Sequence, residues 1–461
     1  MNARLLVLAP LLAAACAGCA TGPDYQRPDL TLPTSWRTGE ASTNSMGGWA
    51  WTELYRDPVL TNLIVTALAN NKDLQIAAAR VEEAQGGYRS QRSALFPAIN
   101  GSGDFTTARV GNIPPAPGAE ADQYNLFGLL SYEVDLWGRV RRLTESARAQ
   151  LLATEEGRRS VEIGLVAGVA SSYFNLRALD RQLEIARDTL ASRSNALELT
   201  RVKFDDGNGI VSELDVAQAQ TQVASAQSAI ASLQRQVALA ENALSLLLGS
   251  NPDAIPRGQT LAEQWQADDM PVGLPSDLLL RRPDVLAAEQ QLVAANANIG
   301  AARAAYFPAI SLTGALGLQS EDLGDLFDTG LSKAWSFQPS LTAPIFNGGR
   351  IRAGVRVAEA QRKGALASYE KAIQTAFRET DDALVSIARI REQLVADESV
   401  VTAEQRRLEL STLRYEGGVA SYSDVLDAQR FLFSAELTAV QTRSALLNAT
   451  VQLYKALGGG W

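Results

Sequence analysis

The chain contains the same unit twice, and this duplication constrains its fold more than any other feature. LFPAI at 95–99 corresponds to YFPAI at 306–310, a separation of 211 residues. The same separation holds as far as Phe204 and Tyr415, after which it becomes 209 residues. An internal repeat of this kind predicts two halves of similar structure.

Apolar residues recur every seven positions in long stretches that contain no proline. The first copy carries Leu176, Leu183, Leu190, Leu197 and Phe204, then Val216, Val223, Ile230, Val237 and Leu244; the second carries Ile387, Leu394, Val401, Leu408 and Tyr415, then Val425, Leu432, Ala439, Leu446 and Leu453. A seven-residue period is typical of supercoiled helices. We therefore expect one long helical hairpin in each copy. The first ascending helix, about 140 to 204, would be about 98 Å long.

Each expected hairpin has one glycine-containing turn between its two helices, at about 205–212 in the first hairpin and 416–421 in the second. Gly207, Gly209, Gly417 and Gly418 suit the left-handed conformation that ends a helix. Ser212-x-x-Asp215 and Ser421-x-x-Asp424 are capping boxes that would start the next helix. Capping alone would account for these aspartates, and a further role is compatible with it.

The segments at 96–136 and 307–346 change to a period of two, which indicates β-strands. Apolar and polar residues alternate through four stretches of about ten residues. Strands of this length with one apolar face are typical of outer-membrane barrels, although a soluble antiparallel sheet on a helical layer would show the same alternation. Flanking aromatic residues and long polar loops favour the membrane. Pro339 and Pro344 fit less well, because a closed barrel has no free edge.

Four strands cannot close a barrel, and an open sheet edge is not tolerated in hydrocarbon. The sequence therefore predicts a homo-oligomer. A trimer would supply twelve strands and twelve long helices, a mixed fold of membrane β-barrel and α-helical barrel.

Composition excludes several classes of function. The chain has no histidine, which removes the commonest general base and zinc ligand, so we expect no catalytic site, metal site or cofactor. The net charge of −9 argues against nucleic acid as a partner, because a nucleic-acid binder needs a basic patch.

The first nineteen residues resemble a lipoprotein leader. Arg4 precedes an apolar run that is too short to span a membrane, and Ala17-Gly18-Cys19 matches the box at which a lipoprotein precursor is cut and its cysteine acylated. Cys19 is the expected lipidation site, with residues 1–18 removed. An ordinary leader with a chance cysteine is the alternative, and Cys16 is a second candidate.

Five motifs in order resemble the TolC-like outer-membrane efflux proteins, in particular their lipoprotein branch. These are CATGPDYQRP (19–28), VDLWGRVRR (134–142), LLLRRPDVLAAEQQLVAANANIGAARAAYFPAISL (278–312), PIFNGGRI (344–351) and YEGGVASYSDVLDAQ (415–429). The resemblance covers essentially the whole mature chain. It implies a trimer whose barrel crosses the outer membrane, with a tunnel that receives cargo from an inner-membrane RND-type pump through a periplasmic adaptor, or membrane fusion protein.

The resemblance also assigns roles near the tips. Asp215 and Tyr415 match latch positions, Asp424 and Asp427 match an acidic constriction, and Gly207, Gly209, Gly417, Gly418 and Val419 would lie where the adaptor docks. Two features depart from the family. The first tip is two residues longer than the second, and Ala420 stands where the best-known channel of the family has an arginine latch.

The organisation expected from these patterns has six parts. They are the signal peptide 1–18, an N-terminal periplasmic segment 19–58, the first repeat 59–250, an equatorial linker 251–275, the second repeat 276–456 and a tail 457–461. The function expected is a passive exit duct for drugs or other toxic small molecules in a tripartite efflux system. The alternative is a lipid-anchored periplasmic adaptor or coiled-coil scaffold without a pore.

Overall fold

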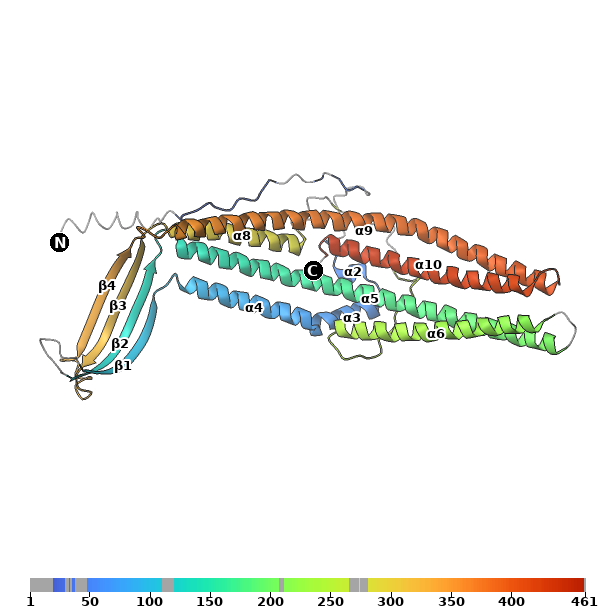
Figure 1. Cartoon of the computed structure of the whole chain (residues 1–461), viewed down its shortest axis with the longest axis horizontal. Helices are drawn as coiled ribbons and strands as arrows, with labels where there is room; N and C mark the ends of the chain where they lie inside the picture. The colour runs from blue at the N-terminus through green and yellow to red at the C-terminus, as the bar shows by residue number, and fades with distance from the viewer. Residues whose placement is uncertain are drawn as a thin grey trace. The chain divides into compact units, whose positions relative to one another are not determined.

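The structure is a computed structural model, and it describes residues 20–29, 33, 35–37, 48–109, 120–206, 211–264, 273 and 281–459. The chain divides into two compact units. Of the described residues, the first unit takes those of 20–29, Arg80–Glu155 and Ala287–Lys371, and the second takes the others. Helices α4, α5, α8 and α9, which are labelled in Figure 1, each contribute residues to both units.

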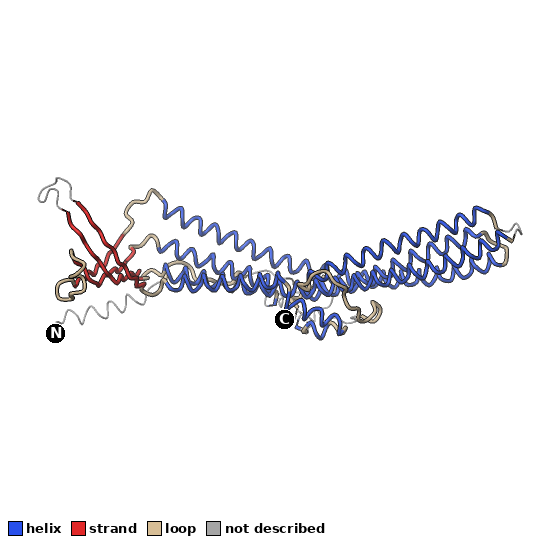
Figure 2. The backbone as a smooth tube through the Cα atoms, turned by 90° about the horizontal axis from the view of Figure 1, so that it is seen from below, coloured by secondary structure: helices blue, strands red, loops and turns tan. Residues whose placement is uncertain are grey.

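The first unit contains one antiparallel sheet of four strands, drawn in red in Figure 2. The strand order is β1-β2-β3-β4 (Figure 1). The strands are β1 (Ala98–Arg109), β2 (Glu120–Val134), β3 (Ala309–Ser320) and β4 (Lys333–Thr342). β2 from the first repeat pairs with β3 from the second, with Leu129 opposite Ala315. The sheet therefore joins the two copies of the repeat, and the prediction of four strands is confirmed.

Large apolar side chains on this sheet are exposed. Trp335 is 76% exposed and Leu316, opposite it in the register, is 71% exposed. Phe105 and Tyr124 are also opposite one another, and their rings stack with centroids 4.6 Å apart. In the described chain β1 pairs only with β2 and β4 only with β3, so both outer edges of the sheet lack a partner strand. Pro339 lies within β4, on one of these edges.

Two helical hairpins of matching length account for the seven-residue periodicity. α5 (Arg139–Asp205) and α9 (Arg350–Glu416) each have 67 residues. Their return helices, α6 (Glu213–Leu247) and α10 (Tyr422–Ala456), each have 35. The shorter helices are α2 (Trp51–Leu54), α3 (Pro58–Asn70), α4 (Lys72–Ser93) and α8 (Pro283–Ala304). The long helices run without interruption because none contains proline.

The core of the second unit lies near the start of α3 and near the C-terminal ends of α6 and α10. The ring of Tyr55 packs edge-on against Phe174 of α5 and Tyr454 of α10, with centroids 6.2 and 6.4 Å apart. Leu244 and Leu453, both heptad residues, are completely buried. On α5 the heptad stripe becomes more exposed towards the tip, where Phe204 is 42% exposed, whereas Val425 near the tip of α10 is buried.

In the first unit, residues 20–29 form a strap against the junction of β2 and α5. The backbone N and Oγ1 of Thr21 both donate to the carbonyl of Trp137, at 3.1 and 3.0 Å. A Cβ on Gly22 would lie 2.4 Å from the Cα of Gly300. The strap therefore crosses α8 at a point where both segments have a glycine. Arg27 forms two hydrogen bonds with the buried Glu289 of α8, at 2.7 and 2.5 Å.

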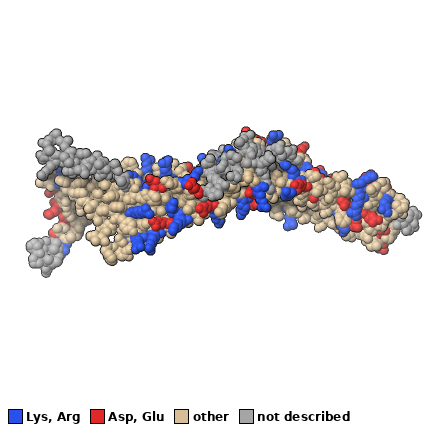
Figure 3. All heavy atoms as spheres, turned by 90° about the horizontal axis from the view of Figure 1, so that it is seen from above, with Lys and Arg blue, Asp and Glu red and all other residues tan. Residues whose placement is uncertain are grey.

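Basic and acidic side chains are interspersed over the face shown in Figure 3. Many form pairs one helical turn apart, such as Arg389 with Glu392 at 2.8 Å. None of the helices described in the structure is both long enough and apolar enough to span a membrane.

Candidate functional site: the hairpin tips and the linker

The second hairpin reverses through a glycine turn, as predicted. α9 ends at Glu416, and Gly418 takes the left-handed conformation with φ +71°. The N–H of Val419 donates to Arg414 O and that of Gly418 to Tyr415 O, both at 3.0 Å. These bonds satisfy the last carbonyls of the helix in a Schellman motif. Gly417 does not take the left-handed conformation, so only one glycine of this pair requires its conformational freedom.

Both predicted capping boxes are present. The Oγ and N–H of Ser212 donate to Asp215 Oδ2 at 2.7 and 2.8 Å, and the N–H of Asp215 donates back to Ser212 Oγ at 3.3 Å. In the second hairpin, the N–H of Ser421 donates to Asp424 Oδ2 at 3.3 Å. Asp215 and Asp424 therefore cap α6 and α10. Gly207 and Gly209 lie outside the described residues, as does Cys19.

The structure brings the two hairpins together around Tyr415. Its ring lies 5.2 Å from that of Tyr422 and 5.2 Å from Lys203 Nζ near the end of α5. A small apolar cluster surrounds these rings, made of Leu197, Ala219, Leu408, Val425 and Leu426. Burial, followed by the negative charge of Asp215, raises the pKa of Tyr415. The Tyr415 hydroxyl therefore stays protonated near neutral pH and can donate a hydrogen bond.

The two aspartates expected to form an acidic constriction have different surroundings. Asp424 is bound to Ser421, whereas Asp427 pairs with Arg430 one turn further along α10, with Nη2 to Oδ1 at 3.1 Å. The side chains of Asp427 and Arg430 are 53% and 62% exposed, so this pair is weak. Neither aspartate belongs to the cluster around Tyr415.

Sequence reasoning missed Lys203 and Tyr422. Tyr422 lies three residues before Val425, the first heptad residue of α10, so it falls on the same face of that helix and could have been found from this spacing. Lys203 is a single basic residue next to Phe204, and no pattern in the sequence marks it.

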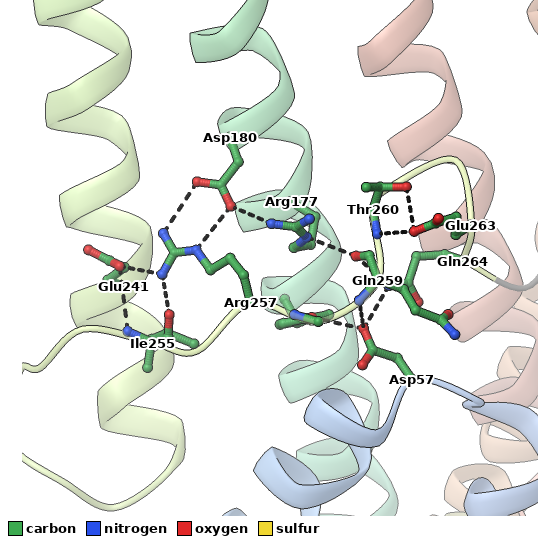
Figure 4. Close-up of polar contacts among 12 residues, drawn as sticks. Asp57, Arg177, Asp180, Glu241, Ile255, Arg257, Gln259, Thr260, Glu263 and Gln264 are labelled. Carbon is green, nitrogen blue, oxygen red and sulfur yellow. Dashed lines mark hydrogen bonds and ion pairs between the residues drawn. The ribbon is translucent and has the colours of Figure 1, made fainter.

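A second polar cluster fixes the start of the linker to the first hairpin (Figure 4). Asp57 caps α3 by accepting from Val59 N at 2.9 Å, and its other oxygen accepts from Tyr173 OH, Gln259 N and Gln264 Nε2 at 2.9, 3.0 and 2.8 Å. Burial acts to raise the pKa of this carboxyl, but the hydrogen bonds outweigh it and the pKa is lowered. Asp57 is completely buried, so it is a buried carboxylate with all its partners on the protein.

Arg257 extends this cluster between α5 and α6. Its Nε donates to Asp180 Oδ2 at 3.0 Å and its Nη1 donates to Glu241 Oε1 at 2.5 Å. Arg177, one turn before Asp180, donates to the carbonyl of Gln259 at 3.0 Å. The linker is thus held by charged groups on both helices of the first hairpin (Figure 4).

Comparison with known proteins places these features in a family. The family model for outer membrane efflux proteins matches residues 63–250 and 274–459. A solvent efflux pump outer membrane protein of Pseudomonas putida, SrpC, is 43% identical over 96% of each chain.

Solved structures agree. A membrane protein from Pseudomonas aeruginosa has 39% identity and a TM-score of 0.90, covering 96% of this chain and 98% of that one. The open MtrE outer membrane channel of Neisseria gonorrhoeae has 34% identity and a TM-score of 0.87 over the same shares. The chain therefore belongs to the outer membrane efflux protein family and is the outer-membrane channel component of an efflux pump.

Proposed function

We propose that three copies of this chain form a passive duct through the outer membrane, which carries toxic small molecules from an inner-membrane RND-type pump and a periplasmic adaptor to the outside. The observation that carries the proposal is the four-stranded sheet, whose outer strands β1 and β4 have no partner among the described strands and whose apolar side chains are exposed. In hydrocarbon such edges must pair, and β4 of one copy can pair with β1 of the next.

Cargo is proposed from the relatives. SrpC is a solvent efflux protein, so apolar solvents and drugs of similar character are the proposed cargo. In this proposal the chain supplies only the path, and the inner-membrane pump supplies the energy.

The architecture is tested by the mass and conductance of the purified protein. Native mass measurement in mild detergent should give three chains, and the protein should conduct in a planar bilayer. Monomers, or a folded oligomer that does not conduct, would favour the alternative of an adaptor or scaffold without a pore.

Two neighbouring residues of β4 test which face of the sheet contacts lipid. Phe337 is 59% exposed and Ser336 points to the opposite face, since successive strand residues alternate. Phe337→Arg should reduce assembly in the membrane, because an arginine facing lipid costs about 2–4 kcal/mol near the midplane. Ser336→Arg should assemble normally and reduce cation preference. Equal defects in both variants would contradict the proposed barrel.

Lipidation of Cys19 is proposed as an aid to sorting and assembly. The strap at 20–29 supports it, because Thr21 and Gly22 hold the chain beside the end of β2. Cys19→Ser should abolish labelling by a radioactive fatty acid, whereas Cys16→Ser should not. Labelling that persists in Cys19→Ser would move the site or refute it.

The tips are proposed as the resting closure and as the place where the adaptor docks. Tyr415 and Asp215 would form the latch, Asp424 and Asp427 would line a constriction around the threefold axis, and Gly417, Gly418 and Val419 would face the adaptor with Gly207 and Gly209. Val419 is 69% exposed on the turn. Val419→Asp should lower solvent tolerance of cells without lowering the amount of trimer, and Val419→Ala should lower it less. Normal tolerance in Val419→Asp would exclude docking through this residue.

A further inference from the structure

A cavity of about 170 Å³ lies between the two hairpins of the second unit. Its α5 lining runs from Arg181 to Arg193 and its α10 lining from Gln429 to Glu436, and Leu408 of α9 completes it. On both helices the lining positions follow spacings of three and four residues, so each helix contributes one face. The cavity is bounded only by described residues and lies closer to the tips than the linker cluster does along α5.

Arg193, which lines this cavity, is a buried cation without a carboxylate partner. Its side chain is 4% exposed, and its Nη1 donates to the carbonyl of Gln222 at 3.1 Å. Its guanidinium lies 5.6 Å from the centre of the Phe433 ring, and its Nε has no hydrogen-bond partner among the described groups. Burial lowers the pKa of Arg193, which is the expected effect of an environment that does not stabilise the positive charge.

Other buried arginines of this protein show that the situation of Arg193 is unusual. Arg142 pairs with Asp24 and Glu145 at 2.7 and 2.8 Å. Arg282 pairs with Asp284 and Glu379 at 2.6 and 2.8 Å. Each of these has two carboxylates, as a buried charge requires. No ion pair is formed by Arg193 with any residue that the structure describes, so only the Gln222 carbonyl and the Phe433 ring are seen to face its charge.

Further polar groups line the same cavity. Gln429 has a buried Oε1 without a partner, and its amide can turn to present its NH₂ group as a donor. Thr189 and Ser192 add two hydroxyl groups, each of which can also donate a hydrogen bond. A guanidinium, an amide and two hydroxyls around a small cavity are a set of donors suited to an anion.

Two carboxyl groups also line the cavity, and their negative charge would weaken the binding of an anion. The charged or titratable lining groups are Arg181, Asp188 and Arg193 on α5 and Glu436 on α10. Burial raises the pKa of Glu436, Arg181 lowers it and Asp188 raises it further, and the net direction is upward. An ionised Glu436 would repel an anion, so replacing its carboxyl with an amide should strengthen anion binding. Asp188 is exposed, so water screens its charge.

We propose that this cavity binds one small monovalent anion, chloride or a short carboxylate such as acetate, against the guanidinium of Arg193. The volume supports a ligand of this size, because cavities for drug-sized molecules measure about 300–1,000 Å³. The anion would be the negatively charged partner of Arg193, and it would link α5 to α10 through the groups that line the cavity. The site does not depend on whether the channel is a trimer or on its cargo.

The test is the melting temperature of the intact protein at constant ionic strength, with sodium chloride or sodium acetate replacing sodium gluconate. Gluconate is larger than either test anion and serves as the reference. The melting temperature of the wild type should rise with the logarithm of the chloride or acetate concentration, as expected for a ligand of the folded state. In Arg193→Met this dependence should be lost. Arg389→Met is the matched control, because it removes an exposed, paired arginine and should retain the full dependence.

Two more variants and a direct measurement keep the result clear. Arg193→Lys should keep a weakened dependence, and Glu436→Gln should lower the chloride concentration that gives half of the shift, by several-fold. Crystals soaked in sodium bromide should show an anomalous peak next to Arg193. The same anion dependence in the wild type and Arg193→Met, or bromide bound elsewhere with none in this cavity, would overturn the proposal.

Discussion

Lys203 Nζ lies 5.2 Å from the centre of the Tyr415 ring, and this contact joins the end of α5 to the end of α9. It links the two hairpins directly at their tips. The ring also packs against Tyr422 and lies close to Asp215, so one tyrosine contacts groups from both hairpins.

Removal of this contact should loosen the tips. A cation–π contact at an exposed site is worth about 0.5–1 kcal/mol, which corresponds to a shift of about two- to five-fold in the equilibrium between closed and open tips. Lys203→Ala should therefore raise the single-channel conductance or open probability in a planar bilayer, and Lys203→Arg should not. Tyr415→Phe keeps the ring, so any increase it causes reports the hydroxyl alone. Unchanged currents in Lys203→Ala would exclude this residue from the closure.

Arg430 should limit the cation preference that Asp427 is proposed to confer. The two form an exposed pair, so Arg430→Gln frees the negative charge and should raise cation selectivity, whereas Asp427→Asn should lower it. The reversal potential across a salt gradient measures both. Asp424→Ala should cost about 1 kcal/mol of stability through the lost cap. If Asp424→Ala changes stability alone and Asp427→Asn leaves selectivity as it was, the constriction lies elsewhere.

Asp57→Asn should destabilise the second unit and remove part of its acid sensitivity. The carboxylate accepts four hydrogen bonds, and loss of its charge should cost about 2 kcal/mol at pH 7. Because its folded pKa is lowered, its stabilising contribution is complete above its unfolded pKa of about 3.9 and is lost as pH falls through the folded value. Melting curves at pH 7 and pH 3 should therefore differ less in Asp57→Asn than in the wild type. The exposed Asp73→Asn is the control and should behave as the wild type does.

Gly300→Ala should release the strap. A Cβ at this position would lie 2.5 Å from Thr21 O and 2.8 Å from Arg142 Cγ, so the strap must move and lose its bonds to Trp137. Hydrogen exchange at 20–29 should accelerate, and the melting temperature should fall by the equivalent of about 1–3 kcal/mol. Gly86→Ala places a Cβ in open space within α4 and should stabilise by up to about 1 kcal/mol. Unchanged exchange in Gly300→Ala would show that the strap is not held at this crossing.

Local patterns predicted the hairpins and the strands well. Heptads, glycine turns and capping boxes are short-range signals, and Ser212 with Asp215 or Gly418 after Tyr415 could be located within one residue. The alternation in β2 likewise depends only on neighbouring residues.

Contacts between distant residues could not be predicted. Asp57 meets Tyr173 and Gln259, which are 116 and 202 residues away, and nothing in the sequence near Asp57 indicates a partner. Arg193 is one of many arginines on α5, and only the packing of α10 against it shows that it is buried. Equivalent positions of the two repeats can also differ in their contacts. Phe204 is 42% exposed, whereas its counterpart Tyr415 packs against Tyr422.

The equal lengths of α5 and α9 restrict which insertions and deletions the chain can accept. One added residue would advance the rest of a helix by 1.5 Å and turn it by about 100°, which would move every heptad residue away from its neighbour. Seven added residues would restore the facing, with an advance of about 10.5 Å. A longer or shorter hairpin therefore requires changes in multiples of seven, made in both 67-residue helices and in both 35-residue helices together. Only the turns escape this rule, and the two extra residues of the first copy lie in its turn.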